Sequence, residues 1–370
     1  MSAVLIDLAS EEDDTALRRL MRETPMEGDL SVAFAREPSF FAASRIEGTR
    51  QDVMALRRRD DPGRIVATAT RSIRPLWFGG EVRELGYLSG LRSVPDARGS
   101  TLLARGYRYL RELHDRDPVP LYYSTIIEDN REVIRVLTSG RARLPTYHDV
   151  GRLRTHSVSL FRRRKGPVPG IDVTPGSREL LPAIVACLER SGRRHPLAPA
   201  IGAAEIEAGA PLLPGLGPES FYVASRGGAV VGCLARWDQG AFKQSIVVAY
   251  RGTMRWVRPL YGVVARLGGF APLPPPGERF PYFYVSFVAI DDDDPEVFRA
   301  LLHRVYDDSL GGRWSFFMVG LHERDPLNAA LSGFRFIPYD ARLYAVQWPD
   351  LPLPREPLDE LVPRPEIAVM

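Results

Sequence analysis

Residues 81–115 constrain the fold more than any other part of the chain, because a strand pattern there leads through a short turn directly into a helix pattern. Gly86 and Gly90 indicate bulges or close approaches of the backbone within the strand. Pro95 marks the turn, and beyond it apolar residues recur at the spacing of one helix face. Such a turn directs backbone N–H groups and the positive end of a helix dipole at one point. The stretch therefore favours a phosphate-binding site at the start of the helix.

The same stretch resembles the acyl-CoA-binding motif of the GCN5-related N-acetyltransferases, in which V-x-P-x-x-R-G-x-G or a close variant separates the strand from the helix. The matching residues are Val94, Pro95, Arg98, Gly99 and Ser100. The family's usual small residues are replaced by Thr101 and Leu103, which narrow the approach of the backbone to the phosphates. The resemblance implies that acetyl-CoA or another acyl-CoA is bound by Ser93, Val94, Arg98, Gly99, Ser100, Thr101 and Leu102. An ordinary strand–turn–helix without a ligand is the alternative.

A second motif follows the central helix. Residues 120–130 predict a buried strand, and Asn130 and Gly140 bound the helix after it. In the resembled family an Asn at the start of this helix contacts CoA, which implies the same role for Asn130. The family often has a tyrosine seven residues later that reprotonates the departing thiolate. This chain has Leu137 there, so no general acid is assigned.

Two residues of the strand before the turn are candidates for catalysis. Acyl transfer to an amine requires a proton acceptor for the amine and a polarised carbonyl. Glu84 and Tyr87 are the candidate side chains, and strand alternation places them on opposite faces unless a bulge intervenes. For each of them an ordinary position in a sheet is the alternative. The resemblance implies that a backbone N–H near Ser93 or Val94 polarises the carbonyl.

Composition excludes several other classes of protein. The chain has 370 residues, enough for two domains, with 45% hydrophobic and 26% charged residues. A formal charge of +3 gives no strong nucleic-acid signal. Two cysteines without a CxxC pair argue against a disulfide framework or a metal site. The acidic N-terminus and the lack of a long apolar run argue against a signal peptide and a spanning helix, so we expect a soluble, cytoplasmic protein.

The order of predicted elements repeats along the chain. We expect an α/β (α+β) fold of two tandem acetyltransferase-like domains, each with a mainly antiparallel mixed sheet flanked by helices. Residues 1–160 form the first domain, 161–170 a linker rich in basic residues, Pro and Gly, and 171–350 the second domain. Residues 351–370 form a Pro-rich tail.

The second domain differs from the first at the turn where a phosphate-binding site is expected. The run Asp291–Asp294 stands where the first domain has its phosphate-binding turn, and carboxylates there would repel a pyrophosphate. The chemistry is therefore expected in the first domain, with the second as a degenerate copy. Residues 251–270 predict an inserted basic amphipathic helix. It packs on its own domain or on a second subunit of a homodimer, or makes a peripheral contact with a membrane or a lipid-like ligand.

These observations together predict an N-acyltransferase that moves an acetyl or other acyl group from acyl-CoA to an amine of a small molecule or peptide. Two alternatives remain open. The chain could be a catalytically inactive CoA-sensing or interaction protein of the same fold. It could also be a long-chain N-acyltransferase, with residues 251–270 covering the chain. The sequence does not name the acceptor.

Overall fold

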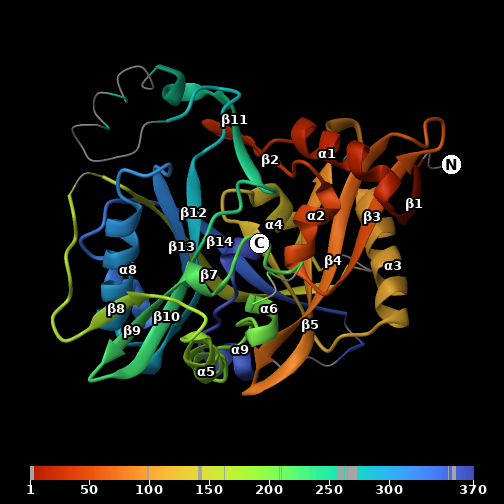
Figure 1. The fold of residues 1–370 in the computed structure, drawn as a ribbon. Coiled ribbons are helices and arrows are strands. Elements are labelled where there is room, and N and C mark those ends of the chain that lie inside the picture. Colours follow the sequence, from red (N-terminus) through yellow and green to blue (C-terminus); the bar gives the residue numbers. More distant parts are fainter. Residues whose placement is uncertain are drawn as a thin grey trace.

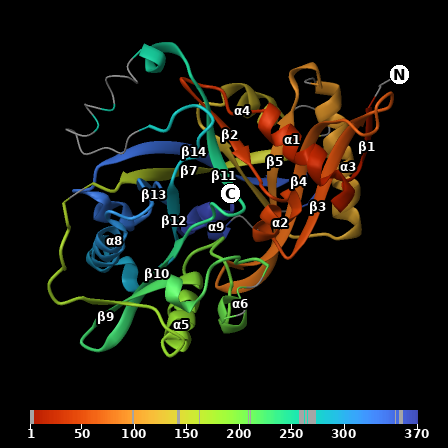
Figure 2. The ribbon, with the colours of Figure 1, turned by 45° about the horizontal axis from the view of Figure 1, so that its top comes forward.

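The computed structural model describes residues 4–97, 100–140, 144–161, 163–207, 209, 211–256, 262, 265, 273–348, 350–351 and 356–370. These residues form one sheet of twelve strands and a separate two-stranded ribbon, with helices on both faces (Figures 1 and 2). The order in the large sheet is β1-β3-β4-β5-β6-β14-β7-β13-β12-β10-β9-β8. The fold is therefore a mixed α/β fold, as predicted.

The strands of the first half are β1 (Val4–Leu8), β2 (Leu30–Ala35), β3 (Arg50–Arg58), β4 (Ile65–Phe78), β5 (Glu81–Ser93), β6 (Tyr122–Ile127) and β7 (Thr146–Ser159). Those of the second half are β8 (Asp172–Pro175), β9 (Phe221–Arg226), β10 (Ala229–Trp237), β11 (Gln244–Tyr250), β12 (Tyr282–Ile290), β13 (Phe316–His322) and β14 (Phe336–Gln347). The helices are α1 (Asp14–Glu23), α2 (Phe40–Ser44), α3 (Ser100–Arg116), α4 (Arg131–Leu137), α5 (Leu181–Gly192), α6 (Ala203–Glu207), α8 (Pro295–Ser309) and α9 (Glu356–Glu360).

The two halves repeat the same unit, which confirms the predicted tandem arrangement. In the first half an antiparallel meander of β3, β4 and β5 leads through α3 to β6, which pairs with β5 in parallel. In the second half β9, β10 and β12 lead through α8 to β13, which pairs with β12 in parallel. The strand and helix predicted within residues 81–115 are β5 and α3.

The last strands of the two halves are exchanged. β14 lies between β6 and β7, and β7 pairs on its other side with β13 rather than with a strand of its own half. β7, the last strand before the predicted linker, therefore does not pair with any strand of its own half among the described residues. A further link between the halves is the antiparallel ribbon of β2 and β11. Neither pairing follows from local periodicity, because both join strands that are far apart in the chain.

Each half has a core on both faces of its sheet. In the first half α1 and α2 pack on one face around Leu17 and Phe40, and α3 and α4 pack on the other around Leu110 and Leu137. In the second half α8 covers one face. α5 covers the other, together with buried residues 367–369. Residues 163–166 of the predicted linker run along α8, where the N–H of Lys165 donates to Asp307 at 2.7 Å.

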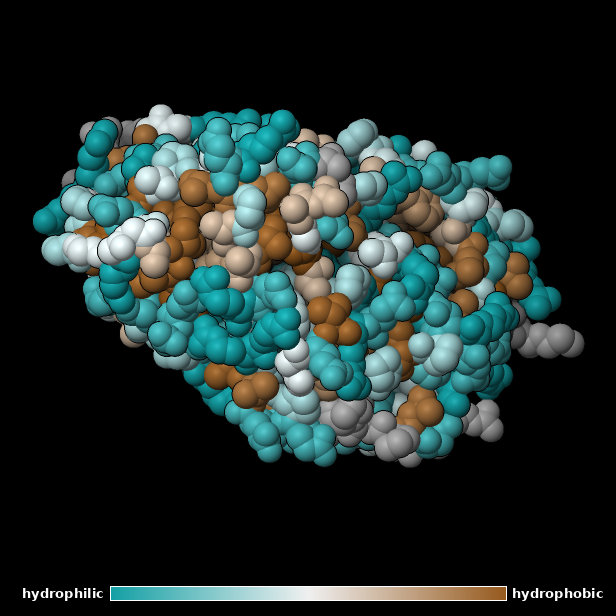
Figure 3. Space-filling model, turned by 60° about the horizontal axis from the view of Figure 1, so that its bottom comes forward, coloured by the Kyte–Doolittle hydropathy of each residue, from teal (hydrophilic) through white to brown (hydrophobic). Residues whose placement is uncertain are grey.

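The surface drawn in Figure 3 is mostly hydrophilic, with apolar side chains gathered in a band at the upper left. Within the described residues no helix is both long and apolar enough to cross a membrane. The C-terminus lies in the middle of the molecule, between the two halves (Figures 1 and 2). Of the segment predicted as a tail, residues 363–369 are buried.

Candidate functional site

β5 and β6 pair over only two positions and then diverge. The paired positions are Gly86 with Tyr122 and Tyr87 with Tyr123. Gly86 is required there, because a Cβ on it would lie 2.2 Å from the ring of Tyr122. Beyond this point β5 carries a bulge opposite β4, where Gly90 has a φ of +64°. No further ladder pair joins the described residues of β5 and β6, and we call this break in the pairing the first opening; at its edge the hydroxyl of Ser124 in β6 donates to the carbonyl of Leu88 at 2.9 Å.

The far end of this opening is the turn before α3. Ser93 pairs with Ala67 of β4, and the buried Val94 donates its N–H to the carbonyl of Val66 at 2.9 Å. α3 begins at Ser100, so its first N–H groups have no partner within the helix. Arg98 and Gly99 lie outside the described residues, as does the side chain of Ser100. Thr101 is exposed, and Leu102 is partly buried against the core beneath α1.

A buried carboxylate lies beside the bulge. Glu47, 1% exposed, accepts a hydrogen bond from the hydroxyl of Ser89 at 2.6 Å. Its other oxygen accepts from Arg36 at 2.9 Å. Ser89 comes directly before Gly90 in β5, while Arg36 and Glu47 follow β2 and α2. A hydroxyl, a carboxylate and a guanidinium therefore form one chain of contacts beside the bulge.

The two candidate catalytic residues lie in different places. Tyr87 stacks on Tyr123 with ring centroids 4.8 Å apart, and its hydroxyl is 3.3 Å from Oγ1 of Thr125. Burial, and then the charge of Glu47, raise the pKa of Tyr87 well above its usual range, so it stays protonated. Glu84 lies near the other end of β5, where its half-exposed carboxylate pairs with Arg50.

The remaining predicted residues have structural contacts of their own. The side-chain oxygen of Asn130 accepts the N–H of Val133 at 3.3 Å and so caps α4, as predicted for the start of that helix. Leu137, at the position of the family's tyrosine, is buried in the core beneath α3. Trp256, in the predicted insertion, is 76% exposed. Most of residues 257–270 lie outside the described chain.

Sequence reasoning did not find Glu47, Ser89 or Lys243. Nζ of Lys243 donates to the backbone oxygens of Ala368 at 3.1 Å and Met370 at 3.4 Å. Burial, reinforced by the charge of Arg36, lowers the pKa of Lys243 to about 7. No local pattern marks these side chains, because each acquires its environment from segments distant in the chain.

The second half contains an equivalent opening. β12 and β13 pair in parallel over residues 282–284 and 316–318 and then diverge. Phe287 lies at a bulge opposite β10 and has a positive φ of +52°. It therefore corresponds to Gly90, which has a positive φ at the bulge of β5. A positive φ is unusual for a phenylalanine, which supports a bulge retained from a common plan.

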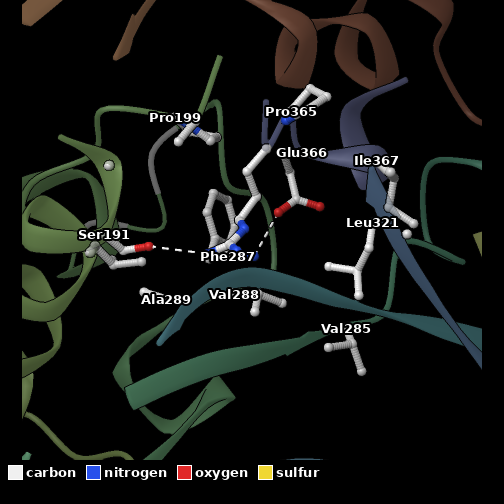
Figure 4. A pocket seen from close by; sticks show the side chains of 15 residues that line it. Ser191, Pro199, Val285, Phe287, Val288, Ala289, Leu321, Pro365, Glu366 and Ile367 are labelled. Atoms are coloured by element: carbon white, nitrogen blue, oxygen red, sulfur yellow. Dashed lines mark hydrogen bonds between the residues drawn. The ribbon is translucent and has the colours of Figure 1, made fainter. Parts of the chain in front are cut away.

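Residues 364–369 occupy this second opening and, with β12 and β13, line a small cavity in it (Figure 4). The N–H of Phe287 donates to the carboxylate of Glu366 at 2.6 Å, and Figure 4 shows Glu366 directed at that backbone. Ile367 lies against Gly320 of β13, where an added Cβ would be 2.5 Å from it. Burial raises the pKa of Glu366. The N–H at the second bulge is thus already hydrogen-bonded to a carboxylate oxygen of the same chain.

The acidic run before α8 is held in ion pairs. Asp291 pairs with Arg190 at 2.9 Å and Asp294 with Arg226 at 2.8 Å. The third partner is Arg364, which joins Asp293 at 3.0 Å to the buried Asp325 at 2.8 Å. The two contacts of Arg364 anchor the segment 364–369.

The fold is that of known acyltransferases. N-myristoyltransferase of Saccharomyces cerevisiae, solved with bound myristoyl-CoA, matches with a TM-score of 0.60 at 12% identity over 94% of this chain and 83% of that one. A GCN5-related N-acetyltransferase from Sphaerobacter thermophilus matches with a TM-score of 0.55 at 13% identity over 94% and 96%. One from Anabaena variabilis gives 0.50 at 10% over 92% and 72%. No family model and no curated protein sequence matches the chain.

These likenesses establish the fold. The chain has the fold of the GCN5-related N-acetyltransferase superfamily, in the tandem form that it shares with N-myristoyltransferase. The resemblance found in the β5–α3 stretch is therefore confirmed at the level of the fold.

Proposed function

We propose that the chain is an acyl-CoA-dependent N-acyltransferase that binds its cofactor in the opening between β5 and β6. The observation that carries this proposal is the parallel pair of β5 and β6, which diverges at a bulge and leads through a short turn into α3. The structural neighbours include an N-myristoyltransferase crystallised with myristoyl-CoA and several GCN5-related N-acetyltransferases, which supports the same class of cofactor. The chemistry is assigned to residues 1–160, with residues 171–350 as the degenerate half.

The cofactor is assigned to β5 and the start of α3. We place the pyrophosphate at Arg98, Gly99, Ser100, Thr101 and Leu102, the pantetheine along Ser93 and Val94, and Asn130 further along the cofactor. The thioester carbonyl is assigned to the backbone N–H at Gly90 rather than to one near Ser93 or Val94, because the N–H of Val94 already donates to the carbonyl of Val66. In the second half the equivalent N–H, that of Phe287, donates to a carboxylate oxygen of Glu366. The N–H of Phe287 shows that a donor at this bulge can bind an oxygen atom. By analogy, the N–H of Gly90 suits the carbonyl oxygen of a thioester.

The proton of the amine is assigned to Ser89 and Glu47. As the amine nitrogen forms its bond to the carbonyl carbon, the C–S bond breaks and the thiolate leaves. The amine proton passes to the hydroxyl of Ser89, which gives its own proton to Glu47 at 2.6 Å. Tyr87 remains a protonated phenol beside them and can donate a hydrogen bond to developing negative charge. Glu84 takes no part in this mechanism, because it lies in an exposed ion pair with Arg50.

The test is CoA release from acetyl-CoA and myristoyl-CoA in the presence of a panel of primary amines. Ser89→Ala keeps the ion pair of Arg36 and Glu47 and should lower kcat by about 100-fold, since a positioned acid–base group contributes 10²–10⁴-fold. Glu47→Gln should lower it at least as much. The matched control is Glu81→Gln, an exposed residue of β5 that pairs with Arg83.

Two outcomes would overturn parts of this account. Loss of activity in Glu84→Gln, with Ser89→Ala active, would move the proton acceptor to the other end of β5. Binding of acyl-CoA without release of CoA from any amine would favour the CoA-sensing alternative. A preference for myristoyl-CoA over acetyl-CoA would select the long-chain form of the enzyme.

A further inference from the structure

Arg92 is a charged side chain that the proposed mechanism does not use. It lies on β5 just beyond the bulge, paired in register with Thr68 of β4. Its guanidinium carbon is 5.7 Å from the ring centroid of Phe34 in β2. Burial, and then the charge of Arg36, lower the pKa of Arg92, and the pKa of Tyr339 in β14, which burial raises, is raised less because of the charge of Arg92. Arg92 thus lies on the side of the opening that carries Arg36, Glu47 and Ser89.

Arg92 has no counter-ion in the described part of the chain. Its guanidinium lies against the ring of Phe34, and the ionisable groups that act on it are Arg36 and Tyr339, neither of which is a carboxylate. Arg36, its neighbour, is already paired with Glu47. The residues outside the described ranges include no Asp or Glu in their sequence, so they hold no carboxylate side chain for it either.

The surroundings of Arg92 are electropositive and partly shielded from water. Arg92 is partly buried, and burial is the main cause that lowers its pKa. Arg36 adds a second positive charge nearby, since its charge is the next cause that lowers the pKa of Arg92. A desolvated guanidinium without a partner is unfavourable, and the planar fork of arginine matches a carboxylate or a phosphate. A bound anion would neutralise the positive charge of Arg92.

We propose that the amine acceptor also carries an acidic group, a carboxylate or a phosphate, and that Arg92 binds it. This inference rests on the proposed function. The amine is assigned to Ser89 and the acidic group to Arg92, which are three positions apart on one strand. Three positions span about 10 Å along a strand, less at a bulge, so both groups fit within one small molecule. The acceptor is therefore a small amino acid or amino phosphate rather than a polycation.

The first arm of the test compares matched amines by CoA release. The pairs are β-alanine with β-alaninamide, and O-phosphoethanolamine with ethanolamine. The wild type should use the acid-bearing member of at least one pair with a kcat/KM about 10-fold higher or more, and the pair that shows it distinguishes a carboxylate from a phosphate. Arg92→Met should lose this preference and Arg92→Lys should keep part of it. Arg83→Met, an exposed change on the same strand, is the control.

The second arm measures binding and does not require turnover. The same amines are titrated into the wild type and Arg92→Met, each saturated with CoA. The acid-bearing amine should bind the wild type and should bind Arg92→Met at least 10-fold more weakly. If the acid-bearing amine binds in this way but no amine causes release of CoA from acyl-CoA, the acceptor site is supported and the proposed function is wrong.

Three results would overturn the inference. The first is equal use, or equal binding, of the acidic and neutral members of both pairs by the wild type. The second is a preference that survives in Arg92→Met. The third is a loss of acetyl-CoA affinity in Arg92→Met that matches the loss of acceptor affinity, which would assign Arg92 to a phosphate of the cofactor.

Discussion

The positively charged side chains in the middle of the molecule differ in how many carboxylate partners they have. Arg364 meets two carboxylates, and Arg36 meets one. Lys243 donates to backbone oxygens and has its pKa lowered to about 7. Arg92 contacts an aromatic ring. The ion pairs of Arg364 hold residues 364–369 in the second half, whereas Arg92 lies on β5 beside the bulge of the first half and has no carboxylate partner among the described residues. This difference is what favours a ligand in the first half.

The pKa of Lys243 predicts how stability depends on pH. It is about 7 in the folded protein, against about 10.4 for an unperturbed lysine. Between these values the unfolded state binds more protons, so the contribution of Lys243 to the free energy of unfolding increases as the pH rises. Urea unfolding between pH 7 and 9 should therefore show a smaller rise in stability for Lys243→Met than for the wild type. Parallel pH profiles of the two proteins would contradict the lowered pKa.

The bulged strands β5 and β12 have the same backbone geometry but different proposed roles. Each pairs in parallel over a short stretch and diverges at a residue with positive φ. In the second half residues 364–369 fill the resulting opening, with Glu366 on the N–H of the bulge. The same backbone geometry can therefore hold a segment of the chain in one half and a cofactor in the other.

A substitution in β13 tests how firmly this segment is held. A Cβ on Gly320 would lie 2.5 Å from Ile367, so Gly320→Val should displace residues 364–369 and lower stability by about 1–3 kcal/mol. Endoproteinase Glu-C should then cleave faster at the bond between Glu366 and Ile367, both of which are buried in the wild type. The control is Gly106→Ala in α3, where an added Cβ meets no atom within 4 Å. Unchanged stability and proteolysis of Gly320→Val would contradict the close packing.

At the scale of the whole molecule, the exchanged strands join the halves into one sheet. β14 separates β6 from β7, and β7 is bonded to β14 and β13. A first half cut from the rest would leave β6 without one neighbour and β7 without either. The duplication of the unit is therefore not a duplication of independently stable parts.

This topology predicts that residues 1–160 expressed alone do not form a stable native structure. The fragment should show little cooperative thermal unfolding by circular dichroism, while the full chain should show it clearly. Addition of residues 161–370 in trans should restore structure if the exchanged strands are responsible. A fragment that unfolds cooperatively on its own would show that the exchange is dispensable.

Much of this organisation could be predicted from the sequence, and the rest has an identifiable cause. The β5–α3 stretch and the Asn130 cap were predictable because their signals are local, in glycines, a proline and apolar spacing. The repeat was predictable from element order. The pairing of β14 with β6 was not, because it depends on strands about 200 residues apart. Glu47 and Ser89 were missed for the same reason, since their contact joins segments 42 positions apart.

The most direct test of the central claim is the affinity for acyl-CoA at the start of α3. Thr101 is exposed in the first turn, so its replacement should leave the fold intact. Calorimetric titration of acetyl-CoA and myristoyl-CoA should show binding to the wild type and to Thr101→Gln. Thr101→Glu, which adds a negative charge beside the proposed pyrophosphate site, should bind at least 10-fold more weakly. Equal affinity of the two variants, or no binding of either acyl-CoA to the wild type, would contradict a cofactor site between β5 and β6.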